Sequence, residues 1–215
     1  MRLRITFSKN GALAYTSHLD LARVWERSLR RAGMPLAYSQ GFNPRPKLQL
    51  AAALPLGHTA EAELMDIWLE KRAPVEKLAK DLVRVLPDGL AVSDVRQVVL
   101  KEPALPVQVV SAEYRVDIDA GETAEAVAER IDRILQAEAL PQERQRAGRK
   151  TKTYDLRPLI EALELEQPGS AEGAVALGMQ LAARQGATAR PEAVLAAMGL
   201  ADVFARYHRR RLVLE

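Results

Sequence analysis

The sequence predicts an α+β protein built from two tandem ferredoxin-like plaits, each a split βαβ unit with two helices on one face of a four-stranded antiparallel sheet. Residues 1–100 show the order strand, helix, strand, strand, helix, strand. A proline-punctuated link follows at residues 101–106, and the same order begins again in residues 107–215. The chain has 215 residues, of which 48% are hydrophobic, so it is long enough to bury a core in each domain.

The first domain begins with a strand, because apolar and polar residues alternate in MRLRITFSK. One face of this strand is apolar, and we expect the other to be a basic outer face. Ser17 then precedes a helix, HLDLARVWERSLRRA, in which Asp20 provides a carboxylate variant of the capping box. Gly33 follows the helix and predicts its end. This helix carries an apolar stripe for the core and a separate stripe of arginines.

The rest of the first domain contains three more strands and one helix. Two strands, LQLAAALPLG and EAELMDIWLE, flank a turn at residues 57–59. The second helix is predicted in APVEKLAKDLVRVLPDGL, where proline stands in the first turn and Pro-Asp-Gly ends the element. The strand AVSDVRQVVL completes the domain.

The second domain repeats the order of elements without evident residue identity to the first. Its predicted elements are, in order, the strand VQVVSAEYRVDID, the helix ETAEAVAERIDRILQAE, a strand or strand pair in KTKTYDLRPLIEALELE, the strand GAVALGMQLAA, the helix RPEAVLAAMGL and the strand YHRRRLVLE.

Composition excludes several classes of function. The chain has no cysteine, which excludes disulfides, thiol nucleophiles, Cys-ligated zinc and an iron–sulfur cluster held by this chain alone. Its three histidines, His18, His58 and His208, are far apart in sequence, so we predict no metal site and no cofactor. No apolar run approaches the roughly 18 residues of a membrane span, and the N-terminus leads directly into a strand. We therefore expect a cytoplasmic protein with no membrane partner.

Positive charge is concentrated in the first 50 residues. They carry nine Lys and Arg against two acids, whereas residues 51–100 carry eight acids against six bases. Such asymmetry favours an anionic partner for the first segment, most commonly nucleic acid. A solvated basic face without a partner is the alternative interpretation.

The first helix and the loop after it supply the candidate RNA-binding residues. Guanidinium groups match phosphate oxygens in pairs, and aromatic rings can stack on unpaired bases. Pro44 and Pro46 make the loop rigid, which reduces the entropy lost on binding. Core packing is the alternative for the aromatic residues, and we expect it for Phe42. The candidates in this region are Arg23, Arg27, Arg30, Arg31, Tyr38, Asn43, Arg45 and Lys47.

A second basic cluster lies in a glycine-containing segment of the second domain. It is predicted as a hairpin tip that extends the RNA-binding surface together with the arginines of the last strand; a charged loop with no partner is the alternative. The candidates there are Arg149, Lys150, Lys152 and Arg209.

Four motifs carry a resemblance to a known family: SHLDL at 17–21, RRAG at 30–33, YSQGFNPRPK at 38–47 and LPLG at 54–57. With these motifs the chain resembles an uncharacterised bacterial family of radical SAM-linked proteins, whose members occur fused to a radical SAM protein or as separate chains. The resemblance implies a radical SAM partner in trans. The loop motif G-x-N-P-x-P with LPLG is also distantly similar to the RAMP superfamily of RNA-processing proteins.

Three functions remain open at this point. The first is a non-catalytic RNA-binding accessory protein that presents structured RNA, tRNA or rRNA, to a radical SAM modification enzyme. The second is a metal-independent RAMP-type endoribonuclease with His18 as base and Tyr15 or Lys47 in supporting roles. The third is a protein-docking module for the radical SAM partner without nucleic acid. His18 also has a purely structural alternative, a local hydrogen bond near the helix start.

Overall fold

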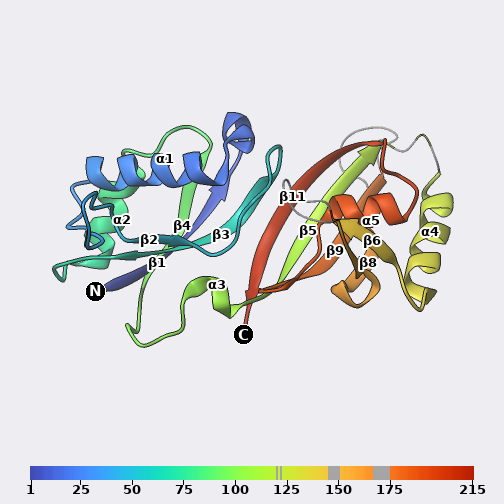
Figure 1. Cartoon of the computed structure of the whole chain (residues 1–215). Coiled ribbons are helices and arrows are strands. Elements are labelled where there is room, and N and C mark those ends of the chain that lie inside the picture. Colours follow the sequence, from blue (N-terminus) through green and yellow to red (C-terminus); the bar gives the residue numbers. More distant parts are fainter. Residues whose placement is uncertain (120, 122, 145–150, 167–174) are drawn as a thin grey trace. The chain divides into compact units, whose positions relative to one another are not determined.

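The computed structural model describes residues 1–119, 121, 123–144, 151–166 and 175–215, with the side chains of Arg144 and Lys152 left out. The chain divides into two compact units, Met1–Val109 with Leu214–Glu215, and Val110–Val213 (Figure 1). Both units combine helices with mostly antiparallel strand pairs, which confirms the predicted α+β class. Of the helices within these described ranges, none is long and apolar enough to cross a membrane.

The first unit has four strands in the order β2, β3, β1, β4, and each neighbouring pair is antiparallel. Leu3 of β1 pairs with Ile67 of β3 and Gln97 of β4, which places β1 in the middle of the sheet. The elements of this unit are β1 (Arg2–Lys9), the 3-10 helix η1 (Gly11–Tyr15), α1 (His18–Arg31), β2 (Leu48–Leu50), β3 (Thr59–Trp68), α2 (Val75–Val83), β4 (Leu90–Val98) and α3 (Leu105–Gln108).

The second unit has the neighbour order β8, β9, β5, β11. Between its first helix and β8 the chain forms an antiparallel hairpin; the sequence predicted a hairpin tip in this segment but assigned a strand only to the second arm. The elements are β5 (Val109–Asp119), α4 (Ala124–Gln136), β6 (Pro141–Arg144), β7 (Lys152–Asp155), the 3-10 helix η2 (Arg157–Leu159), β8 (Ile160–Glu166), β9 (Val175–Arg184), β10 (Ala187–Thr188), α5 (Pro191–Ala197) and β11 (Phe204–Leu214).

The core of the first unit lies between one sheet face and the helices α1 and α2. The side chain of Phe7 in β1 meets Trp25 in α1 edge to face, with 4.8 Å between ring centroids. Leu82 of α2 is buried in the same cluster. Because β1 alternates in and out of this face, its odd-numbered residues supply the apolar contacts. The cluster therefore fixes α1 to the sheet along its whole length.

The opposite face of β1 is buried as well, so the expected basic outer face was wrong. Arg2 and Arg4 are both 2% exposed, and the Asp66 carboxylate of β3 accepts a hydrogen bond from the Nε of each at 2.9 Å. The backbone carbonyls of Glu102 and Pro103 accept the other N–H groups of Arg2 at 2.9 and 3.0 Å. Part of the predicted link at residues 101–106 thus contacts this face, and the two arginines serve the structure rather than an external ligand.

Candidate functional site

Helix α1 begins with the predicted capping box. The Asp20 backbone N–H donates to Ser17 Oγ at 3.1 Å, and the Ser17 hydroxyl donates to Asp20 Oδ2 at 2.7 Å. Arg23 donates to the other carboxylate oxygen at 2.8 Å. The Ser17 hydroxyl first, and the Arg23 guanidinium second, lower the pKa of the Asp20 carboxyl below its usual 3.8. Arg23 is therefore already engaged by an acid of its own helix.

The other arginines of α1 are exposed near its C-terminal end. In the part of the chain that the structure describes, the side chains of Arg27, Arg30 and Arg31 form no hydrogen bond or ion pair with another residue. Cations in the last turn of a helix interact favourably with its dipole, which accounts for part of their placement. Their head groups remain available to an external anion.

The loop at residues 38–47 is closed by its own hydrogen bonds. Tyr38 and Pro46 form an antiparallel bridge, and inside it the Ser39 N–H donates to the Arg45 carbonyl at 2.8 Å. The Arg45 N–H donates in return to Ser39 Oγ at 3.0 Å. Gly41 has a φ of 143°, a conformation that favours glycine. The loop predicted to be rigid is therefore closed at its base and has a defined tip.

Backbone hydrogen bonds place this loop at the same end of α1 as its exposed arginines. After α1 ends, the Ala37 N–H donates to the Trp68 carbonyl at the end of β3 at 2.8 Å. The Lys47 N–H donates to the Ala37 carbonyl at 2.7 Å, and the Lys47 carbonyl accepts from Trp68 N–H at 3.1 Å. The N–H of Glu70 donates to the Pro35 carbonyl at 2.9 Å, which brings the chain after β3 to this end too.

We call the resulting cluster of exposed cations the basic end. It contains two residues that sequence reasoning missed, Lys71 and Arg72, because they belong to a chain segment whose overall balance is acidic. Only the hydrogen bonds between the end of β3 and the base of the loop show that Lys71 and Arg72 lie near the other cations. In the contributing stretches 25–47 and 69–72, seven cations stand against two acids, Glu26 and Glu70. The cations are Arg27, Arg30, Arg31, Arg45, Lys47, Lys71 and Arg72, all exposed.

The aromatic candidates of the loop differ in exposure. Tyr38 is 38% exposed, and its backbone forms the bridge with Pro46 at the base of the loop. Phe42 has a relative exposure of 106%, so the expectation that it packs in the core was wrong. The reason is the short closure between Ser39 and Arg45, which leaves the intervening residues projecting into solvent. Asn43 is exposed beside it.

The three residues of the ribonuclease hypothesis are not brought together. Tyr15 and His18 are exposed at the N-terminal end of α1, where Gly57 N–H donates to the carbonyl of Ala14. Lys47 lies at the other end, against the last residue of β3. An α-helix of the 14 residues of α1 is about 21 Å long, which exceeds the reach of a lysine side chain several-fold. His18 and Lys47 therefore cannot act on one phosphate.

The second basic cluster gives a mixed outcome. Arg149 and Lys150 lie outside the described residues, and of Lys152 only the backbone, at the start of β7, is described. Arg209 is 2% exposed and thus does not contribute to an exposed surface. Its neighbour Arg211 is bound to Glu113 at 2.6 Å, an ion pair that lowers the pKa of the Glu113 carboxyl and raises that of Arg211.

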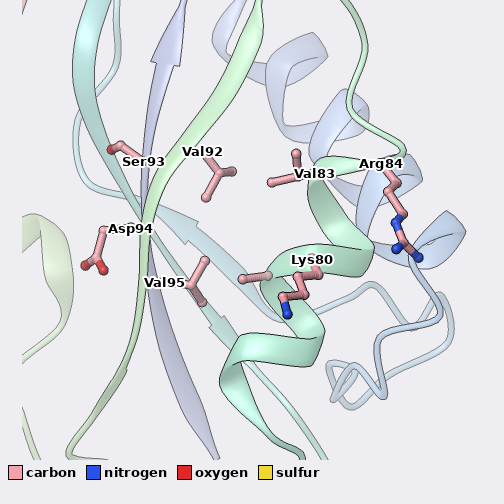
Figure 2. A pocket seen from close by; sticks show the side chains of 8 residues that line it. Lys80, Val83, Arg84, Val92, Ser93, Asp94 and Val95 are labelled. Carbon is pink, nitrogen blue, oxygen red and sulfur yellow. The ribbon is translucent and has the colours of Figure 1, made fainter.

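A shallow apolar groove lies between α2 and β4 (Figure 2). Val92 and Val95 of β4 point toward Val83 of α2, and Lys80 lies at its rim. Strand β4 pairs with β1 along one edge and has no strand partner along the other within the described residues of the first unit. The groove and this open edge could accept an extended segment of another protein.

Among the side chains that the structure describes, no group of three or more His, Asp or Glu residues is arranged to hold a metal ion.

The fold and the basic end define an α+β protein with a candidate surface for an anionic ligand. The sequence comparison narrows this class: residues 2–191 match the family described as an uncharacterized protein conserved in bacteria (DUF2344), and the chain belongs to that family. The predicted membership of an uncharacterised bacterial family is thereby confirmed. No curated protein matches the sequence.

Two solved structures are similar to the whole chain at 12% sequence identity. One is titled "Crystal Structure of a Cbf5-Nop10-Gar1 Complex" and has a TM-score of 0.52, covering 98% of this chain and 48% of that one. The other, of the archaeal box H/ACA sRNP Nop10-Cbf5 complex, has a TM-score of 0.47 with the same coverage. The chain spans about half the length of these relatives, and the first likeness shows the fold alone.

Proposed function

We propose that this protein is a non-catalytic RNA-binding accessory protein that presents structured RNA, such as tRNA or rRNA, to a modification enzyme on a separate chain. The observation that carries the proposal is the basic end, where seven exposed cations from α1, the loop at residues 38–47 and the segment after β3 come together. The resemblance to radical SAM-linked proteins suggests that the enzyme is a radical SAM protein. A chain without cysteine needs such a partner to hold the iron–sulfur cluster.

We interpret the fold of both units as the split βαβ plait. In each unit the second strand of the motif lies outermost beside the third, and the first lies between the third and the fourth. The β6–β7 hairpin is then an insertion into the second plait. This architecture agrees with the distant RAMP similarity, and it supports RNA binding only through the residues that it exposes.

The basic end suits phosphate recognition because its cations are exposed and its loop is already ordered. Arginine side chains at the end of α1 can form paired N–H···O bonds with phosphate oxygens, and Lys47 adds a point charge. The closed loop between Tyr38 and Pro46 loses little conformational entropy when it binds. Phosphate contacts of this kind give affinity and register and carry no base sequence information.

The decisive experiment measures RNA affinity against salt concentration for two quadruple variants. One replaces Arg27, Arg30, Arg45 and Lys47 by glutamine, and the matched control replaces the exposed cations Lys77, Lys80, Arg84 and Lys101. Each lost phosphate contact lowers the salt slope by roughly one, so the first variant should bind weakly with a flattened slope. The control variant should retain most of the RNA affinity and most of the salt slope. Equal losses in the two variants, or an unchanged slope in the first, would contradict the proposal.

The α2–β4 groove favours a second candidate function, protein docking without nucleic acid. Its apolar lining and the open edge of β4 suit strand addition by a partner. Crosslinking in cells followed by RNA sequencing distinguishes the two candidates. Recovery of specific RNA crosslinks supports the accessory function, whereas their absence alongside protein crosslinks at α2 and β4 supports docking alone.

A further inference from the structure

From the geometry of the loop tip we infer that Phe42 is a stacking platform for an unpaired base, so the RNA bound at the basic end carries a bulged, looped or terminal nucleotide beside a paired stem. This inference rests on the proposed function and specifies the class of RNA. Arg27 and its neighbours would hold stem phosphates, while Phe42 would take the base that leaves the stack.

The first argument is the exposure of Phe42. Its relative exposure is 106%, so the whole ring is solvated although a large apolar side chain gains free energy when buried. The exposure of the ring is not due to an open, unstructured loop. Two hydrogen bonds between Ser39 and Arg45 close the loop directly behind its tip. A rigid support that holds an aromatic ring out in water is typical of a recognition surface.

The second argument is the chemistry that surrounds the ring. Asn43 follows Phe42 directly, and its amide can donate to or accept from the edge of a base. Arg45 and Lys47 lie on the returning arm of the same loop, within reach of the phosphates that flank a stacked nucleotide. An apolar protein partner would leave these polar and charged groups desolvated without a counter-charge. A nucleotide satisfies the ring, the amide and the cations together.

The third argument concerns the shape of RNA. In an A-form duplex the bases are stacked on one another, and the deep major groove is too narrow for side chains to read. A projecting phenylalanine therefore finds no free base face along a continuous stem. It finds one where a base is unpaired, and base–aromatic stacking is tolerant of sequence because every base has a π-face. The loop tip thus selects RNA by structure rather than by sequence.

The experiment compares three RNAs of otherwise identical sequence: a blunt duplex, the duplex with one bulged nucleotide, and the bulged duplex with an abasic site at the bulge. Binding is measured for the wild type, Phe42→Ala, Phe42→Trp and the control Phe204→Ala, which removes another exposed phenylalanine. Stacking on one base changes affinity by about tenfold or more. The wild type, Phe42→Trp and Phe204→Ala should each prefer the bulged duplex over both other RNAs by that factor. Phe42→Ala should bind all three like the duplex.

Each other outcome has a distinct meaning. A wild type that binds none of the three RNAs overturns the proposed function itself. A wild type that binds all three equally, or a preference that survives Phe42→Ala, overturns the stacking inference and leaves RNA binding intact. Weakening of the plain duplex by Phe42→Ala to the same extent as the bulged one also overturns it, because the ring would then act on the loop and not on a base. Loss of the preference for the bulged duplex in Phe42→Trp also overturns the stacking inference.

Discussion

At the scale of single residues, arginine has two different roles in the first unit. The arginines near the end of α1 are exposed, whereas Arg2 and Arg4 of β1 are buried in ion pairs. Arg2 and Arg4 alternate with apolar neighbours, and the period of two correctly predicts that they share one face of β1. It does not predict that this face is covered, because the covering segment comes about 100 residues later in the chain. Asp66 carries one signal, because it is an acid between the apolar residues Met65 and Ile67 of β3, and in the sheet it lies opposite Arg4.

We predict that Asp66→Asn strongly destabilises the first unit. The Asp66 carboxylate is fully buried and is hydrogen-bonded to both guanidinium groups. Removal of its charge leaves two buried cations whose nearest remaining acid, Glu102, approaches Arg4 at 3.8 Å. Breaking a buried ion pair in this way costs about 3–5 kcal/mol. Urea unfolding should show this loss, whereas the exposed control Asp94→Asn should stay within about 0.5 kcal/mol of the wild type. Similar midpoints for the two variants would contradict the prediction.

At the scale of elements, local signals predicted α1 almost completely. Ser17 and Asp20 fix its start, Gly33 with a φ of 68° follows its end, and its buried stripe includes Trp25 and Leu29 as the spacing requires. The proline spacing predicted a rigid loop after it, and in the structure hydrogen bonds between Ser39 and Arg45 close this loop. The orientation of Phe42 was not predictable, since a hydrophobic residue next to a turn packs inward or projects according to which hydrogen bonds close the turn.

We predict that the α1 cap makes a pH-dependent contribution to stability. Ser17→Ala removes the hydroxyl that accepts from the Asp20 N–H and should lower the free energy of unfolding by about 1 kcal/mol. Because the folded-state pKa of Asp20 lies below its usual 3.8, its carboxylate contribution is present above that value and disappears as the pH falls through the folded pKa. Thermal melts from pH 7 to pH 2.5 should show a smaller acid-induced loss in Ser17→Ala than in the wild type. A parallel loss in both proteins would contradict the prediction, and Asp88→Asn, in an exposed turn, is the control.

At the scale of the whole molecule, the order of elements and the α+β class followed from periodicity, while the composition of the basic end did not. Its cations come from α1, from the loop and from the segment after β3, and they meet because β3 ends where that loop begins. Charge counted along the chain separates Lys71 and Arg72 from their spatial neighbours. The same topology separates His18 from Lys47. The ribonuclease hypothesis had grouped these two residues because both lie in the basic first 50 residues.

This separation predicts that the protein binds RNA without cleaving it. Metal-free cleavage needs one group to deprotonate a 2′-hydroxyl and another to protonate the leaving oxygen, and each contributes roughly 10²–10⁴-fold when positioned at the same phosphate. Tyr15 and His18 lie at one end of α1, a helix about 21 Å long, and Lys47 lies beside the end of β3 at the other end of that helix. Folded RNA incubated with pure protein in EDTA should therefore remain intact, and His18→Ala should leave RNA affinity within about twofold of the wild type, because His18 is outside the basic end. Cleavage by the wild type that His18→Ala abolishes would instead establish a ribonuclease centred on the N-terminal end of α1, with an acid other than Lys47.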